Sequence, residues 1–154
     1  MRKLISFFHI SLDGFVAGPN GEMNWITIDQ EIFDHVGIRI GTGDMAMYGR
    51  VTYQMMENYW PTAADKPNAT KHDIEHSKWY KHAHKVVLSN SMKDTVLPNT
   101  TVISDNLIHQ VNAIKNSQGE NQSDILVFGS PTATHAFMEQ NLIDGFWLCG
   151  EIEY

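Results

Sequence analysis

Short apolar runs alternate along the chain with longer segments in which apolar residues recur at the spacing of a helix. The periodic segments predict helices near residues 28–40, 51–59, 107–114 and 131–137. The apolar runs predict strands at residues 4–10, 44–48, 85–89, 101–104, 125–128 and 143–149. Strands that alternate with helices favour an α/β fold built on a central, mostly parallel sheet.

Turn-forming and capping residues set the expected boundaries of these elements. Residues 11–24 are rich in Gly, Pro, Asn and Asp and predict a long loop. Thr27 and Gln30 form a capping-box pattern at the start of the first helix. Pro61 predicts the end of the second helix. The most polar stretch, residues 62–85, is expected to be a surface excursion within the same domain.

Composition narrows the class of protein. The chain has 154 residues, which fits a single domain over residues 1–154. Its 11 basic and 18 acidic residues give a formal charge of −7, which argues against nucleic acid or an anionic membrane as the main partner. A single cysteine, Cys149, excludes an internal disulfide, and no apolar stretch is long enough to span a bilayer. We therefore expect a cytoplasmic protein whose partner is a small molecule.

Two turns follow predicted strands and precede predicted helices. Residues 129–132, Gly-Ser-Pro-Thr, place small residues where backbone N–H groups and a helix dipole can face an anion, with Ser130 at the N-cap. Residues 49–52, Gly-Arg-Val-Thr, offer close backbone approach, a guanidinium and a hydroxyl. Both turns fit phosphate binding, although a well-capped helix and a surface arginine beside a turn explain them at least as simply.

Two carboxylates near the long loop are candidates for acid–base chemistry. Asp13 precedes Gly14 and is also explained as a turn residue. Asp29 lies near the start of the following helix, where a carboxylate is favoured by the helix dipole. Local sequence leaves both the chemical and the structural interpretation open.

The segment 72–76, His-Asp-Ile-Glu-His, matches the pattern of inverted zinc proteases. On a helix His72 and His76 share one face and could hold a metal. Five-residue matches arise easily by chance, the segment is polar as expected of a solvated helix, and no convincing third ligand follows. We therefore expect no metal, and a zinc hydrolase using His72 and His76 stays an alternative.

Four motifs in order resemble one family. They read SLDGFVAGPNGEMNW at 11–25, MYGRVTYQMM at 47–56, KVVLSNS at 85–91 and ILVFGSPTATHAFMEQNLID at 125–144. Over residues 3–144 the chain resembles the dihydrofolate-reductase-like superfamily. Within that superfamily it is most similar to the reductase domain of the bifunctional riboflavin-biosynthesis deaminase-reductase and its stand-alone bacterial relatives.

The resemblance implies a three-layer sandwich and an NADPH site, with NADH not excluded. It places the phosphates at the two glycine turns, the adenosine ribose near the turn at 89–91 and the nicotinamide beside the long loop. Asp13 and Trp25 would edge the substrate pocket, and Asp29 lies where folate reductases carry their acid, so Asp13 and Asp29 are the catalytic candidates. The implied cofactor-binding residues are Val16, Ala17, Gly49, Arg50, Thr52, Ser89, Asn90, Ser91, Gly129, Ser130 and Thr132.

Three departures from the family pattern stand out. Ser130 occupies the second position of a turn that is usually Gly-Gly, and Asn90 stands where folate reductases commonly place a basic residue. After Asp144 the family usually continues into an acidic residue and two further strands, whereas this chain reads Gly145 and reaches Tyr154, so its C-terminal strands are expected to be shortened.

The combined prediction is an NADPH-dependent reductase. It would transfer a hydride to a small heterocyclic substrate, such as a ribosyl-aminopyrimidine or a pterin-like compound. The alternative from another class is a relative that binds a dinucleotide without turnover. An apolar strand at 143–148 left at a sheet edge also predicts a homodimer.

Overall fold

A computed structural model of the chain describes residues 1–26, 30–41, 43–117 and 123–151. The helices are α1 (Gln30–Ile40), α2 (Arg50–Ala63), α3 (Lys71–His82), α4 (Leu107–Asn116) and α5 (Pro131–Glu139). The strands are β1 (Leu4–Ser11), β2 (Met45–Gly49), β3 (His84–Leu88), β4 (Thr100–Ile103), β5 (Ile125–Phe128) and β6 (Gly145–Glu151).

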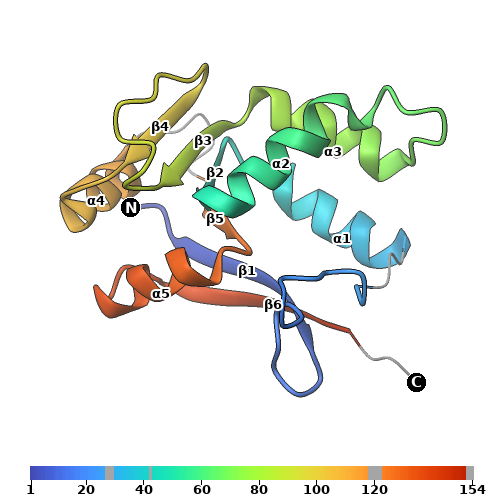
Figure 1. Cartoon of the computed structure of the whole chain (residues 1–154), viewed down its shortest axis with the longest axis horizontal. Coiled ribbons are helices and arrows are strands. Elements are labelled where there is room, and N and C mark those ends of the chain that lie inside the picture. Colours follow the sequence, from blue (N-terminus) through green and yellow to red (C-terminus); the bar gives the residue numbers. More distant parts are fainter. Residues whose placement is uncertain (27–29, 42, 118–122, 152–154) are drawn as a thin grey trace.

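The strands form one parallel sheet in the order β4-β3-β2-β5-β1-β6. Side chains alternate across it, so that Met47 and Val127 pack in one core with α4 and α5, whereas Tyr48 and Phe128 pack in another with α1, α2 and α3. Helices therefore cover both faces of the sheet (Figure 1). The predicted α/β three-layer sandwich is confirmed.

The order in which strands join the sheet reverses at its middle, between β2 and β5. Strands β2 and β5 are neighbours, with Ala46 opposite Leu126 and Met47 opposite Val127. Helix α2 leaves the end of β2 on one face, and α5 leaves the end of β5 on the other. In parallel α/β sheets such a switch point opens a crevice beyond the carboxyl ends of the strands. The turns at 49–50 and 129–130 lie on either side of this crevice.

Two helix predictions need correction. Helix α2 runs through Pro61 to Ala63; because Pro61 lies in the last turn, it removes only one late hydrogen bond of the helix. The polar stretch 62–85 is more than a surface excursion, since α3 buries His76 and Tyr80 against the second core. Polar and aromatic residues on its inner face hide this burial from the hydropathy pattern.

The last strand begins two residues later than predicted because Asp144 is used as an anchor. Its carboxylate accepts a hydrogen bond from the Leu4 N–H at 2.7 Å and pairs with Lys115 Nζ at 2.6 Å. Lys115 is buried and also donates to the Leu142 carbonyl at 3.1 Å. Burial raises the pKa of Asp144, but hydrogen bonds from Lys115 and Leu4 outweigh it and leave this pKa below its usual value.

Strand β6 lies at the sheet edge next to β1. Its Phe146 and Leu148 side chains are about half exposed, at 51% and 50%. The homodimer through this strand stays a prediction. No helix among the described residues is both long and apolar enough to cross a membrane.

Candidate active site

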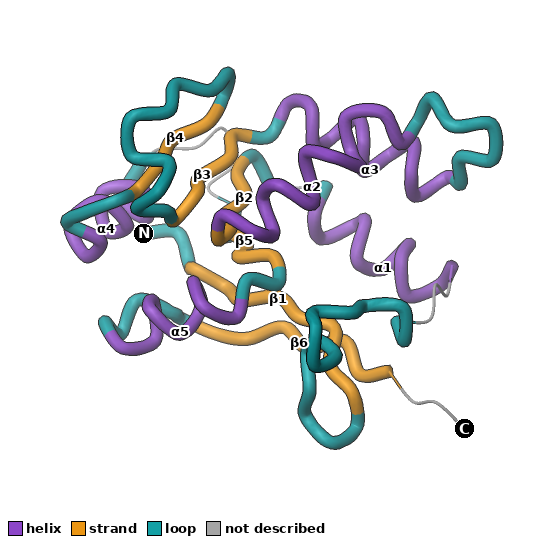
Figure 2. The backbone as a smooth tube through the Cα atoms, viewed as in Figure 1, coloured by secondary structure: helices purple, strands orange, loops and turns teal. Residues whose placement is uncertain are grey.

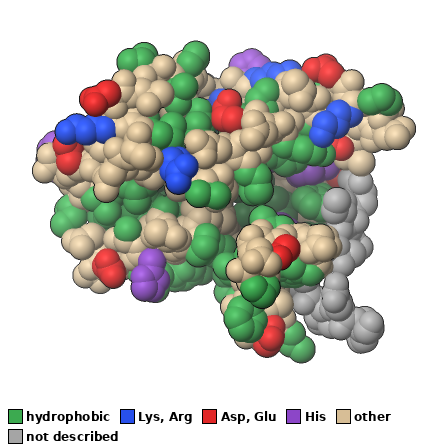
Figure 3. Space-filling model, viewed as in Figure 1, with side chains coloured by type: hydrophobic (Ala, Val, Ile, Leu, Met, Phe, Trp, Pro, Cys, Tyr) green, Lys and Arg blue, Asp and Glu red, His purple; other side chains and the backbone are tan. Residues whose placement is uncertain are grey.

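A cavity of about 1190 Å³ opens at the carboxyl ends of the strands. The segments after β1, β2, β3, β4 and β5 all contribute to it. Figure 3 shows a recess bordered by hydrophobic side chains, and Figure 2 shows the loop after β1 folding back beside α1. All eleven residues that the sequence resemblance assigns to the cofactor line this cavity.

One hydroxyl joins the two glycine turns. Ser130 Oγ accepts a hydrogen bond from the Gly49 N–H at 2.9 Å and donates to the Phe128 carbonyl at 2.8 Å. Ser130 is buried and occupies the N-cap position of α5, yet its hydroxyl makes no capping bond. The predicted N-cap position of Ser130 is therefore confirmed, but its side chain does not cap the helix. Its left-handed backbone, with φ of 58°, turns the hydroxyl toward β2 instead.

The donors around these turns suit an anion. Arg50 is exposed, begins α2 and donates from Nη1 to Gln54 Oε1 at 3.3 Å. Thr52 lines the cavity from the first turn of α2, and Thr132 lines it from the start of α5. The first N–H groups of a helix have no partner within the helix, so the start of α5 presents backbone donors and a positive dipole end to the cavity.

Polar residues after β3 and β4 form the far end of the cavity. Ser89 and Ser91 lie with their hydroxyl oxygens 3.2 Å apart, and the Ser89 N–H donates to the Ile103 carbonyl at 3.0 Å. The segment 104–106, which follows the neighbouring strand β4, also lines the cavity and contains Asp105, whose carboxylate accepts a hydrogen bond from Gln110 at 3.1 Å. Sequence reasoning missed this segment, although a polar turn after a β-branched strand is its signal.

Only some of the loop residues that were expected at the site line the cavity. Val16 and Ala17 are half-buried and line the cavity. Asp13 and Trp25 do not line it: Asp13 is exposed and accepts a hydrogen bond from the Ser11 hydroxyl at 2.6 Å, and Trp25 Nε1 donates to the Glu22 carbonyl at 3.1 Å. Asp29 lies outside the described residues.

Aromatic rings from three helices form another side of the cavity. We call Phe33 of α1, Trp60 of α2, and His72 and His76 of α3 the aromatic wall; all four line the cavity. The ring centres of Phe33 and His72 are 4.4 Å apart, and those of Trp60 and His76 are 4.0 Å apart. Burial lowers the pKa of His76 to about 3 and also lowers that of His72, so both rings are neutral at pH 7.

His72 and His76 pack within a group of aromatic rings. Their ring centres lie 5.4 Å apart, and His76 packs against Trp60 and Trp79. Glu75 is exposed and does not line the cavity. Within the described part of the chain, no group of three or more His, Cys, Asp or Glu residues could hold a metal ion.

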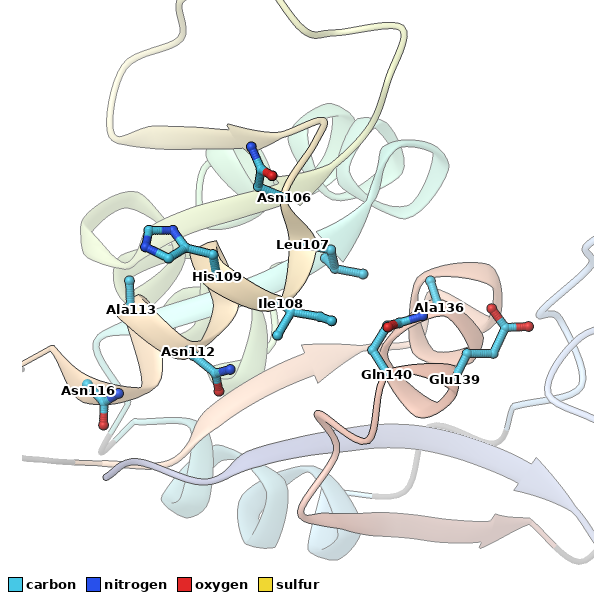
Figure 4. A pocket seen from close by; sticks show the side chains of 10 residues that line it. All are labelled: Asn106, Leu107, Ile108, His109, Asn112, Ala113, Asn116, Ala136, Glu139 and Gln140. Carbon is cyan, nitrogen blue, oxygen red and sulfur yellow. The ribbon is translucent and has the colours of Figure 1, made fainter.

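A second hollow lies outside this site. It is an open groove between α4 and α5, lined mainly by amide and aliphatic side chains (Figure 4). Its charged or titratable lining residues, within the described chain, are His109 and Glu139. The cavity at the switch point holds far more of the groups that recognise ligands.

The hydroxyl link between the turns predicts a measurable contribution to stability. Replacing Ser130 with alanine removes the acceptor of the Gly49 N–H and the donor to the Phe128 carbonyl. We expect the free energy of unfolding in urea to fall by about 1–2 kcal/mol. Ser91→Ala is the matched control, because the Ser91 hydroxyl contacts only that of Ser89 at an exposed position. Equal stability of the two variants would contradict the link.

The buried imidazole of His76 predicts a pH dependence. Its folded pKa of about 3 lies below the ordinary value near 6.5, so between these values the unfolded chain binds the extra proton. Stability should therefore fall as the pH drops from about 7 to 5, with His76 contributing up to about 1.4 kcal/mol per pH unit. His76→Phe should flatten the measured slope, and a substitution of exposed His135 controls for removing a histidine. An unchanged slope in His76→Phe would contradict this prediction.

Comparison with known proteins identifies the family. The sequence profile of the RibD C-terminal domain matches residues 2–149, so the chain belongs to this family. The protein YyaP of Bacillus subtilis (strain 168), described as uncharacterized, is 28% identical over 149 residues, which are 96% of this chain and 73% of YyaP.

Two solved structures share the fold. A protein from Shewanella sp. PV-4 with a provisional assignment to riboflavin biosynthesis gives a TM-score of 0.64 at 18% identity, over 96% of this chain and 76% of that one. The diaminohydroxyphosphoribosylaminopyrimidine deaminase/5-amino-6-(5-phosphoribosylamino)uracil reductase of Thermotoga maritima gives 0.51 at 14% identity, over 94% of this chain and 44% of that one. The resemblance to riboflavin-type reductase domains is thereby confirmed, and the family indicates an oxidoreductase.

Proposed function

We propose that this protein is an NADPH-dependent reductase that transfers a hydride to a small heterocyclic substrate. The observation that carries the proposal is the pair of glycine turns, joined by the Ser130 hydroxyl, that open on one cavity at the switch point of the sheet. Family membership supports the reductase class. The cavity volume of about 1190 Å³ is ample for a cofactor and a small substrate together.

The donor set fits a dinucleotide. Arg50 and Thr52 would hold phosphate from one side, and Gly129, Ser130 and Thr132 from the other, with the start of α5 contributing backbone N–H groups. The turn at 89–91 would contact the adenosine ribose, and Val16 and Ala17 would lie beside the nicotinamide. The bound cofactor would supply the hydride, and the protein would orient it and exclude water.

The proposed reaction also needs a group that donates a proton to the substrate. Asp105 is the only carboxylate among the described lining residues, and it follows β4, the strand at one edge of the sheet. The neutral His72 and His76 are poor proton donors at pH 7 because of their lowered pKa values. Asp29 remains the acid proposed from the sequence resemblance, with ordered water as the other source.

A titration of NADPH and NADH against the purified protein tests the proposal. Energy transfer from the four tryptophans to the bound nicotinamide should report a dissociation constant well below millimolar. NADH is titrated beside NADPH because the additional phosphate of NADPH lies on the adenosine ribose, near the turn where Asn90 stands in place of a basic residue. If neither cofactor binds below millimolar concentration, the proposal fails.

Turnover separates the alternatives. Cofactor oxidation in the presence of pyrimidine and pterin substrates supports the reductase, whereas tight binding without oxidation supports a relative that only binds the dinucleotide. Stoichiometric zinc by elemental analysis, lost in His76→Ala, would favour the hydrolase instead.

A further inference from the structure

We propose that the substrate of this site is a planar heterocycle that carries no phosphate group and binds against the aromatic wall. The inference rests on the proposed reductase function and specifies its substrate class. Phe33, Trp60 and His72 all line the cavity, and their rings contact one another at centre distances of 4.4 Å for Phe33–His72 and 5.7 Å for Trp60–His72. A continuous surface of rings of this kind favours a flat, unsaturated ligand.

Most of the other residues at this end of the cavity are apolar, and the exception is His9 of β1, whose ring centre lies 6.2 Å from that of Phe33. Met23, Ile26, Val36, Ile40 and Met56 line the cavity together with the wall. Burial keeps the two imidazoles neutral, so the wall offers ring faces and neutral ring nitrogens rather than charge. A ligand with a doubly charged phosphate would lose its hydration here without gaining a partner.

Positive charge is placed at a distance from the wall. Among the lining residues that the structure describes, Arg50 is the only lysine or arginine. Arg50 begins α2 and Trp60 lies ten residues further along the same helix, which is about 15 Å at the rise of an α-helix. One guanidinium at the glycine turns serves the dinucleotide and cannot also neutralise a phosphate on a ring stacked at Trp60.

The lysine next to His72 in the chain does not add a positive charge to the cavity lining. Lys71 pairs with Asp34 of α1 at 3.6 Å and does not line the cavity. The residues outside the described part of the chain include no lysine, arginine or histidine. The Thermotoga maritima protein, by contrast, is named for a phosphoribosyl substrate. Among the described residues that line the cavity, the wall therefore offers ring faces for a heterocycle but no second lysine or arginine for a phosphate.

Matched ligand pairs test the inference directly. We would titrate riboflavin against riboflavin 5′-phosphate, and uridine against uridine 5′-monophosphate, with and without NADP⁺, and follow flavin fluorescence and competition. At least one unphosphorylated member should bind, and its phosphorylated counterpart should bind no more tightly. Tighter binding of a phosphorylated member in the presence of NADP⁺, or no binding of any of the four ligands, would overturn the inference.

Variants connect the binding to the wall. Trp60→Leu and His72→Ala should each weaken binding of the unphosphorylated ligand by about tenfold. Tyr59→Leu is the matched control, because Tyr59 neighbours Trp60 on α2 but does not line the cavity. His72 is only half-buried, so His72→Ala keeps the test available if Trp60→Leu fails to fold. Unchanged affinity in a folded His72→Ala would also overturn the inference.

The same samples keep this inference separate from the proposed function. NADPH binding is measured on each of them by energy transfer from tryptophan. Ligand discrimination at the wall without NADPH binding would leave the substrate inference standing and remove the reductase proposal. NADPH binding together with a preference for the phosphorylated ligand would support the reductase proposal and overturn the substrate inference.

Discussion

Replacing Arg50 with alanine should weaken NADPH binding by roughly ten- to a hundredfold. Arg50 is the only lysine or arginine among the described residues that line the cavity, and it lies at the turn proposed to hold phosphate. A charge-assisted contact of this kind is worth about 1.5–3 kcal/mol, which converts to that range of affinities. Stability should change little, because the side chain is exposed and contacts only Gln54.

Arg50→Lys and a salt series sharpen this test. Lysine keeps the charge but loses the planar fork, so its dissociation constant should fall between those of the wild type and Arg50→Ala. Added salt should weaken NADPH binding to the wild type more than to Arg50→Ala, because salt screens the Arg50–phosphate contact that only the wild type makes. Lys93→Ala, a surface lysine that does not line the cavity, is the control for net charge. Equal NADPH affinities of the wild type and Arg50→Ala would mean that Arg50 does not contact the phosphates of the cofactor.

Most of the fold could be predicted because the buried positions of its strands and helices are apolar. These apolar residues form short runs in the strands and recur at helical spacing in the helices. The buried runs at 125–128 and 45–49 give strands at those positions, and α1, α4 and α5 follow apolar positions at helical spacing. The strand ends then determine where a ligand site forms, so Gly49, Arg50 and Gly129 meet at one cavity as expected. Which helix covers which face depends on crossovers that a local pattern does not encode.

The aromatic wall could not be predicted in the same way. Its residues come from three helices, and His72 and His76 occur in a polar segment whose period gives no signal of burial. Their neutrality arises from packing against Trp60, a contact between α2 and α3 that only the tertiary structure provides. The Ser130 hydroxyl is a similar case, because its partner Gly49 lies 81 residues away in the chain.

Replacing Gly129 should have the largest effect on cofactor binding. Gly129 has φ of 51°, and a Cβ built there would lie 3.9 Å from Thr52 Cγ2, in ordinary contact. A side chain at this position would therefore extend between the two glycine turns, where the phosphates are proposed to lie. We expect Gly129→Asn to weaken NADPH binding by more than about a hundredfold, since backbone donors and Arg50 would both be kept at a distance.

Asparagine is chosen because it tolerates the left-handed backbone better than other residues with side chains. The loss of affinity can then be separated from a loss of stability, which should stay near 1 kcal/mol in urea unfolding. Gly14→Asn is the matched control: its φ is +93°, nothing lies within 4 Å of its added Cβ, and it does not line the cavity. We expect Gly14→Asn to bind NADPH as the wild type does. If a folded Gly129→Asn also retained wild-type affinity, the phosphates could not pass between the two turns, and a dinucleotide would have to bind this cavity in another orientation.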